Sequence, residues 1–312
     1  MRTECSANSW CPKFRCYKTS AISSISTQEP SGICATPKAL RAWAPYSRPK
    51  ISMNSSEAPL ATRCCSVNVG ALFTRTSSFT MREYSLDDCY PPEYIEDYVD
   101  KSLRNLGLKT LDLIQLHTWE DKWLDDKRLL PVVEKLKSGG KVRAFGISMN
   151  RWEPWNGVRA VRDGVADAVQ VIYNIFDQNP EDELFPACRE KDVAVIARVP
   201  FDEGSLTGSL TVDSKWPKGD WRNTYFVPEN LKATVERVEK LKSVRRGGIS
   251  LAEMALRFIL NNKDVSTIIP GMRRIANVEA NTGASDRGPL SGPLHAELRK
   301  HRWDRTPTKW SQ

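Results

Sequence analysis

A histidine, His117, ends the short apolar run that begins at Leu111, and four later apolar runs end in polar or charged side chains. If these runs are buried parallel strands of a barrel, their carboxyl ends meet at the face where such barrels hold their active sites. One histidine at a strand end is more often structural than catalytic, but polar groups at five successive strand ends indicate a ligand site. The five ends carry His117 with Trp119, Ser148 with Asn150, Gln170 with Tyr173, Arg198 with Pro200, and the segment Pro270, Gly271, Met272 and Arg273.

The elements that would position these groups alternate between strands and helices from Met81 onward. Each strand is a nearly continuous apolar run, which is typical of a parallel sheet buried on both faces. Five such units are recognisable, whereas a closed (β/α)8 barrel needs eight. The expected strands are 111–117, 142–148, 168–173, 193–199 and 266–269, and helices are expected near 92–106, 130–138, 155–162, 229–243 and 250–261.

Local signals predict where several helices begin and end. Gly107 is expected to end the helix that follows Pro91 and Pro92, because glycine readily adopts the left-handed conformation. Asn179 is expected to cap a further helix that has Pro180 at its first position. Ser250 with Glu253 has the spacing of a capping box.

The charge of the chain is concentrated at its beginning. The net charge is +8, and residues 1–80 hold ten Lys or Arg, three Glu and no Asp, which leaves about +1 for residues 81–312. A near-neutral domain behind a basic leader does not indicate nucleic-acid binding. No apolar run has the length of a membrane span. The oligomeric state is left open.

Residues 1–80 follow a different pattern, with fourteen Ser and six of the eight Cys, and only Val67–Phe73 resembles a strand. A basic, Ser-rich leader is typical of a transit peptide, but sequence translated out of frame, or a replaced start, is the alternative. We favour this alternative, because a transit peptide would precede a complete domain and the front of the domain is not recognisable. The irregular Cys spacing does not indicate zinc, and we expect ordinary thiols in a reducing, cytoplasmic compartment.

From about residue 82 to its end, the sequence resembles the aldo-keto reductase family. Six pieces carry this resemblance, in the order and spacing of the family. They are Ser102–Gly107, Leu111–His117, Gly140–Ser148, Val169–Val171, Gly204–Gly208, and Ile269–Arg273 ahead of Asn281.

The resemblance implies a (β/α)8 barrel, of which strands four to eight are recognisable in residues 81–312, and an enzyme that reduces small carbonyl compounds with NADP(H). His117 matches the histidine that orients the carbonyl, and Trp119 matches a wall of the substrate pocket, with loop packing as the alternative. Gln170 and Ser148 match residues that hold the nicotinamide amide. The role of Asn150 is less defined, because Met149 separates it from Ser148.

The resemblance also implies a nucleotide site on the later strands. Arg198 stands where the family places an aromatic residue or Ser beside the nicotinamide, so it departs from the pattern. Gly271, Met272 and Arg273 are expected to open the last helix, whose N-terminus favours an anion, and Arg273 to pair with the adenosine 2′-phosphate. Asn277 and Asn281 fit adenine contacts. The loop expected over the pyrophosphate contains Pro200, Phe201, Glu203, Gly204 and Leu206.

Three further residues of the family, an aspartate, a tyrosine and a lysine, have no convincing match here. No Asp precedes Asp87, and Tyr17 and Tyr46 lack matching surroundings. Arg75 falls near the expected lysine, but an arginine does not replace a lysine that tunes a proton donor. We therefore expect an impaired oxidoreductase, and the alternative is a non-catalytic NADP-binding or interaction protein. The substrate is not indicated.

Overall fold

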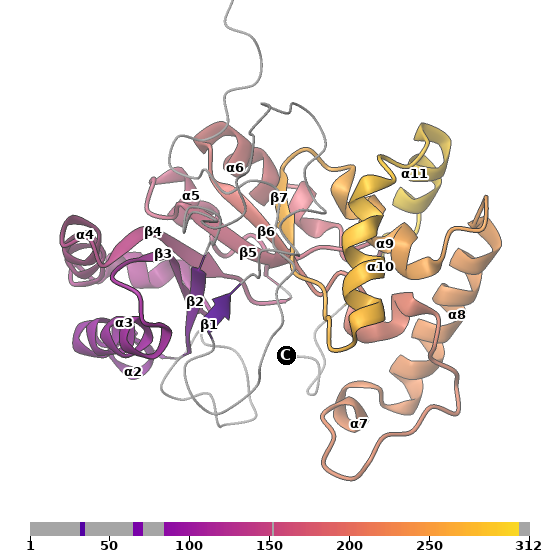
Figure 1. Cartoon of the computed structure of the whole chain (residues 1–312), viewed down its shortest axis with the longest axis horizontal. Helices are drawn as coiled ribbons and strands as arrows, with labels where there is room; N and C mark the ends of the chain where they lie inside the picture. The colour runs from indigo at the N-terminus through magenta and orange to yellow at the C-terminus, as the bar shows by residue number, and fades with distance from the viewer. Residues whose placement is uncertain (1–31, 35–64, 71–83, 152, 306–312) are drawn as a thin grey trace, which may run out of the picture.

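A mainly parallel sheet forms the centre of the computed structural model, which describes residues 32–34, 65–70, 84–151 and 153–305 (Figure 1). The strands lie in chain order, and β1 is antiparallel to β2 while all other neighbours are parallel. Within the described residues β1 and β7 form the two edges. The strands are β1 (Gly32–Cys34), β2 (Cys65–Gly70), β3 (Leu111–His117), β4 (Val142–Ser148), β5 (Ala168–Ile172), β6 (Ala194–Arg198) and β7 (Val265–Ile268).

The five strands expected from the sequence are confirmed as β3 to β7, and β2 adds a sixth parallel strand. Val67–Phe73 is the run of residues 1–80 that resembles a strand in the sequence, and β2 (Cys65–Gly70) overlaps it but begins and ends earlier. In this strand Val67 and Val69 are buried in the main core, while Ser66 and Asn68 alternate with them. Such a short polar–apolar alternation is a weaker signal than the continuous apolar runs of β3 to β6. Arg75, Tyr17 and Tyr46 lie outside the described residues.

Helices cover the sheet and extend beyond β7. In Figure 1, α3 and α4 lie beside β3 and β4, and α8 to α11 lie past the β7 edge. No helix of the described residues has both the length and the apolar character needed to cross a membrane. The helices are α2 (Leu86–Cys89), α3 (Pro92–Leu106), α4 (Leu129–Ser138), α5 (Val158–Arg162), α6 (Leu184–Lys191), α7 (Arg222–Tyr225), α8 (Pro228–Val244), α9 (Leu251–Leu260), α10 (Ile275–Asp286) and α11 (Gly292–Arg299), with the 3-10 helices η3 (Asp121–Asp125), η4 (Asn179–Glu181) and η5 (Asp202–Thr207).

Of the three predicted helix ends, Gly107 is confirmed, the capping box of Ser250 and Glu253 is confirmed only for Ser250, and Asn179 is wrong. Gly107 ends α3 in the left-handed conformation, with φ of 64°. Ser250 caps α9 by accepting a hydrogen bond from the Glu253 amide, although the Glu253 carboxylate pairs with Arg257. Asn179 is not a helix cap, because it lies inside η4 and α6 begins only at Leu184, where the buried apolar residues start.

The two faces of the sheet differ in chemistry. Ile114, Leu116 and Phe145 belong to the large core on the helix-covered face. The opposite face carries the small cluster of Leu113, Ala144 and Ala168. Because side chains alternate along a strand, Gln115 and His117 share this second face with Leu113, and we call it the site face.

Candidate functional site

Three of the predicted site residues lie at one level of the sheet, at the carboxyl ends of their strands. The register pairs His117 of β3 with Ser148 of β4, and Ser148 with Gln170 of β5. Directly paired residues of parallel strands point to the same face, so the three side chains meet on the site face. The sequence prediction that these groups lie together agrees with this arrangement.

A series of hydrogen bonds connects these three side chains and one more, Gln115. Gln115 Nε2 donates to Gln170 Oε1 over 3.2 Å, and Gln170 Nε2 lies 3.5 Å from Ser148 Oγ. Ser148 Oγ is 2.8 Å from His117 Nδ1. We call Gln115, Gln170, Ser148 and His117 the amide–histidine series. When the Gln170 amide donates to Ser148 Oγ, the Ser148 hydroxyl can donate to His117 Nδ1. The neutral imidazole then carries its proton on Nε2.

The imidazole of His117 is held in its neutral form. Burial, with a contribution from the positive charge of Arg198, lowers the pKa of His117 to about 4. Both causes act against a second proton on the ring. With Nδ1 engaged by Ser148, a hydrogen bond from this ring to a ligand must come from Nε2.

Gln115 is the site residue that sequence reasoning missed. Its Nε2 also contacts Ser66 Oγ and Asn68 Oδ1 of β2, each over 3.1 Å, while its Oε1 is buried without a partner among the described residues. The signal was present, since a glutamine two positions before His117 must face the same side of the strand. The two hydrogens of Gln115 Nε2 already face three acceptors, so the unused group of Gln115 is its acceptor Oε1, which could receive a hydrogen bond from a ligand amide.

Glycine at position 146 makes room for Gln115. A Cβ at Gly146 would lie 2.9 Å from Gln115 Cγ and 3.0 Å from the Ala168 carbonyl oxygen. Both distances are too short for a Cβ atom. Position 146 of β4, the strand between β3 and β5, therefore has to be glycine for the Gln115 side chain to reach Gln170.

Trp119 lies in the core rather than at an open surface. Its ring is fully buried and packs edge-on against Trp123 and Phe145, and its Nε1 donates to Asp121 over 2.8 Å. This arrangement favours the loop-packing alternative over the predicted pocket wall. Asn150 is partly buried two residues after Ser148.

Arg198 ends β6 on the same face. It stands two residues after Ile196, the residue that pairs with Gln170. Its guanidinium donates to the Met149 carbonyl oxygen over 3.0 Å. Burial lowers the pKa of Arg198 to about 10, although Glu203 acts in the opposite direction.

The loop after β6 is fixed by buried ion pairs. Asp202 is fully buried and accepts hydrogen bonds from Arg151 over 2.9 Å and from Arg305 over 2.8 Å. Burial alone would raise the pKa of Asp202, but Arg305 and Arg151 outweigh it and lower that pKa. Asp177 accepts from Arg305 over 2.6 Å, and Glu203 from Arg151 over 3.2 Å.

The amides of this loop are engaged within the loop itself. The N–H groups of Gly204 and Leu206 both donate to the Phe201 carbonyl oxygen. Two of the groups expected to cradle a pyrophosphate are therefore used in the turn, and a phosphate would have to compete with that carbonyl. Pro200 and Leu206 are buried, and Phe201 packs against the main core.

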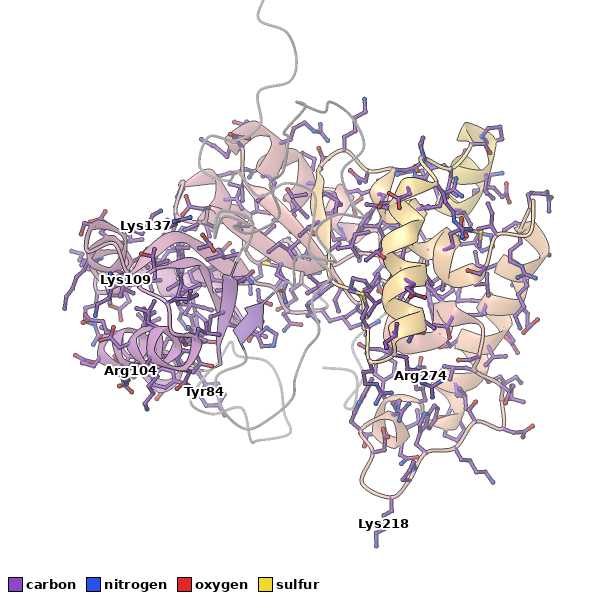
Figure 2. All side chains as sticks on the ribbon, in the orientation of Figure 1. Tyr84, Arg104, Lys109, Lys137, Lys218 and Arg274 are labelled. Carbon is purple, nitrogen blue, oxygen red and sulfur yellow. The ribbon has the colours of Figure 1, made fainter. Side chains whose placement is uncertain are left out.

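The segment after β7 corrects one prediction. Gly271, Met272 and Arg273 precede α10 instead of opening it, since the extended Arg274 caps a helix that begins at Ile275. Figure 2 shows Arg274 at this end of α10. The helix is also not the last, because Gly292 and Pro293 start α11.

Among the other nucleotide-site candidates, Arg273 and Asn277 are exposed. Asn281 is 5% exposed, and its side chain lies 3.4 Å from the Gly271 carbonyl oxygen. Asn281 thus ties α10 to the preceding loop. The described part of the chain contains no group of three or more His, Cys, Asp or Glu that could hold a metal ion.

Comparison with known proteins gives consistent matches. The sequence model described as "Aldo/keto reductase family" matches residues 54–302, and so extends further towards the N-terminus than the six pieces. The chain is 30% identical over 199 residues to the aldo-keto reductase yakc of Schizosaccharomyces pombe, whose name carries NADP(+), covering 62% of this chain and 58% of that protein. It is 29% identical over 198 residues to the NADH-specific methylglyoxal reductase of Escherichia coli, covering 62% and 60%. The chain thus spans about three-fifths of the length of these relatives.

Solved structures with the same fold include the aldo-keto reductase AKR11C1 from Bacillus halodurans. Its holo form matches with a TM-score of 0.57 at 24% identity, over 79% of this chain and 75% of that chain. Its apo form matches with a TM-score of 0.55 at 26% identity, over 71% and 72%.

Proposed function

The chain belongs to the aldo/keto reductase family, and on this basis we propose that it binds NADP(H) and holds a small aldehyde or ketone for reduction by hydride transfer. The observation that carries the proposal is the amide–histidine series at the strand ends. It combines carboxamide-binding groups with a neutral imidazole on one face of the sheet. The contact between Gln170 Nε2 and Ser148 Oγ is long, so a ligand carboxamide would compete with it. The ligand oxygen would accept from Gln170, and the ligand N–H would donate to Ser148.

In this proposal the cofactor supplies the hydride to the carbonyl carbon. His117 donates a hydrogen bond from Nε2 to the carbonyl oxygen, which orients the carbonyl and stabilises the negative charge that develops on it. Ser148 fixes both the ring orientation and the tautomer through Nδ1. Since the pKa of His117 is lowered to about 4 by burial and by Arg198, the ring acts as a neutral donor and is not expected to supply the proton, which the alkoxide would then take from water.

We further propose that turnover is slow. The tyrosine that supplies the proton in the family has no match in the recognisable part of the sequence. Tyr90 donates to the carbonyl oxygen of Thr118, in the loop directly after β3, over 3.2 Å, and burial raises the pKa of Tyr90 well above its ordinary value. It anchors the loop and is unsuited to proton transfer. Loss of a general acid costs roughly 10²–10⁴-fold in rate.

The preference for NADP(H) over NAD(H) rests on Arg273, because the two curated relatives carry different cofactors in their names. Arg273 is exposed and precedes α10, where its guanidinium can form two hydrogen bonds to a 2′-phosphate. The substitution Arg273→Ala is expected to weaken NADPH binding about 10-fold or more and to leave NADH binding unchanged. Equal effects on both cofactors would contradict this assignment.

Non-catalytic NADP binding is the second candidate function. It is favoured by the fact that most residues matching the family here are those expected to hold the cofactor. Fluorescence titration with NADPH and oxidation of NADPH with a panel of aldehydes separate the candidates. Saturable binding with slow turnover supports the impaired reductase, and binding with no turnover supports the second candidate. Robust turnover would contradict the impairment, while absence of binding would contradict both.

A reducing, cytoplasmic location remains part of the proposal. The thiols of Cys89 and Cys188 are buried. Burial raises the pKa of Cys89 to about 11 and that of Cys188 to about 12. Such thiols are unreactive, which fits a compartment where structural disulfides are rare.

A further inference from the structure

Gln115 lies at the centre of the polar groups on the site face, and only 1% of its surface is exposed. The register pairs it with Asn68 of β2 on one side and with Gly146 of β4 on the other. Because Gly146 has no side chain, Gln115 reaches across β4 to Gln170 of β5. Gln115 therefore forms the end of the amide–histidine series that is opposite His117.

The amide–histidine series has a direction, because each of its contacts needs one donor and one acceptor. Gln115 Nε2 donates to Gln170 Oε1, and this turns Gln170 Nε2 towards Ser148 Oγ. The Ser148 hydroxyl can then donate to His117 Nδ1, so that the neutral ring carries its proton on Nε2. In this direction the ring can donate a hydrogen bond to a ligand.

The opposite direction would use the same contacts after a half-turn of each amide. If Gln115 presented its oxygen to Gln170, the Gln170 nitrogen would have to donate to it, and the Gln170 oxygen would face Ser148. The Ser148 hydroxyl would then donate to Gln170, and His117 would donate to Ser148 from Nδ1. His117 Nε2 would carry no proton, and the ring could only accept a hydrogen bond from a ligand.

The surroundings of Gln115 favour the first direction. Its Nε2 lies 3.1 Å from Ser66 Oγ and from Asn68 Oδ1, and 3.2 Å from Gln170 Oε1. Its Oε1 is buried without a hydrogen-bond partner among the described residues. A half-turn of the amide would place the NH2 group in that position, where two donors rather than one acceptor would lack partners. Because buried unpaired donors are the costlier case, the amide of Gln115 keeps its nitrogen towards Gln170.

We propose that Gln115 is a positioning residue that selects the tautomer of His117 through the two side chains between them. The inference rests on the proposed function only for the role of His117 Nε2 as a donor to a carbonyl oxygen. A ring with the opposite tautomer could not provide that hydrogen bond. Gln115 thus determines the hydrogen-bonding character of the site from a buried position that lies away from the strand ends.

Nitrogen-15 NMR of the full chain without cofactor tests the proposal, because protonated and unprotonated ring nitrogens have different chemical shifts. In the wild-type chain at neutral pH we expect the His117 proton on Nε2. In Gln115→Glu an ionised carboxylate can only accept hydrogen bonds, so Gln170 has to turn its nitrogen towards it.

The series is then reversed, and the ring proton should move to Nδ1 as the new carboxyl ionises. The titration extends from neutral pH to about pH 10, since burial can raise the pKa of a glutamate to about 8–9. A wild-type ring protonated on Nδ1, or a Gln115→Glu ring that keeps its proton on Nε2 at every pH, would overturn the proposal.

A second variant, Gln115→Leu, removes the direction without adding a charge. It should change the tautomer ratio of His117 about 2–10-fold in favour of Nδ1, the range that corresponds to one net hydrogen bond. The matched control Gln178→Leu removes another buried glutamine, whose Nε2 donates to the carbonyl oxygens of Ile175 and Arg299. It should lower the stability and leave the tautomer unchanged. Equal changes in the tautomer ratio of both variants would identify a general packing effect and refute the proposal.

The background Ser148→Ala tests whether the effect passes through the series. In this background Gln115→Glu should no longer move the ring proton, since the hydroxyl between Gln170 and His117 is missing. A proton that still moves would show that the added charge acts on the ring directly, and the proposal would be wrong. Titration with NADP+ separates this outcome from the proposed function. If the wild-type chain does not bind NADP+, the proposed function fails, while the tautomer measurements still decide the role of Gln115.

Discussion

At the scale of single residues, the surroundings of His117 determine the protonation state of its imidazole. An imidazole in water takes up a proton near neutral pH, but burial and Arg198 lower the pKa of this one to about 4. The ring therefore stays neutral at neutral pH, and its contact with Ser148 occupies Nδ1 and leaves Nε2 for a ligand.

The lowered pKa predicts how stability depends on pH. Between about pH 4 and 6.5 the unfolded chain binds a proton at His117 and the folded chain does not. The free energy of unfolding should therefore fall as the pH is lowered through this window, by at most about 1.4 kcal/mol per pH unit from this residue. Urea unfolding of wild type and His117→Gln at several pH values checks this. Equal slopes for the two proteins would show that His117 titrates normally.

At the scale of elements, the spacing between β3, β4 and β5 depends on Gly146. The substitution Gly146→Ala places a methyl group 2.9 Å from Gln115 Cγ and 3.0 Å from the Ala168 carbonyl oxygen. We expect a loss of about 1–3 kcal/mol in the free energy of unfolding, together with weaker NADPH binding as Gln115 moves away from Gln170.

The control for this variant is Gly283→Ala in α10, where an added Cβ meets nothing within 4 Å. It should be neutral or stabilising by up to about 1 kcal/mol, because alanine favours helix. Urea unfolding compares the two variants. Similar stabilities would contradict the tight packing at Gly146.

At the scale of the whole molecule, a buried ion network joins loops that are far apart in the sequence. Asp202 and Arg305 are separated by 103 residues, and Arg151 reaches Asp202 from the loop after β4. Removing one partner leaves the other charges buried, so Asp202→Ala is expected to cost about 3–5 kcal/mol in the free energy of unfolding.

Asp182→Ala serves as its control, since Asp182 forms an exposed ion pair with Arg302. Its cost should be about 0–1 kcal/mol. Chemical denaturation of both variants measures the difference. A cost for Asp202→Ala no larger than that of Asp182→Ala would mean that the network does not hold the loop after β6.

The features that could be predicted from the sequence are those with a local signal. Strands β3 to β6 are continuous apolar runs, so their ends, and with them His117, Ser148 and Gln170, were correctly placed. The prediction of Asn179 as a helix cap is wrong, because α6 begins only at Leu184, where the buried apolar residues start. The start of the last helix at Gly271 was implied by the family resemblance and had no local signal, and α10 begins at Ile275.

Two further features of the site had weak signals or none. Gln115 was recognisable only through its alternation with His117. The pairing of Asp202 with Arg305 had no local signal, because long-range ion pairs leave no periodicity in a sequence. Local pattern therefore locates the strand-end groups, and the contacts between distant loops require the structure.

The protonation and ligand response of His117 test the central claim most directly. Because the chain has three histidines, nitrogen-15 NMR of the imidazoles, assigned with His117→Gln, can follow this ring alone. We predict a neutral His117 with its proton on Nε2 at neutral pH, and a change in its signals when NADP+ is added. A ring that titrates near 6.5, the ordinary value, and does not respond to NADP+ would contradict the account.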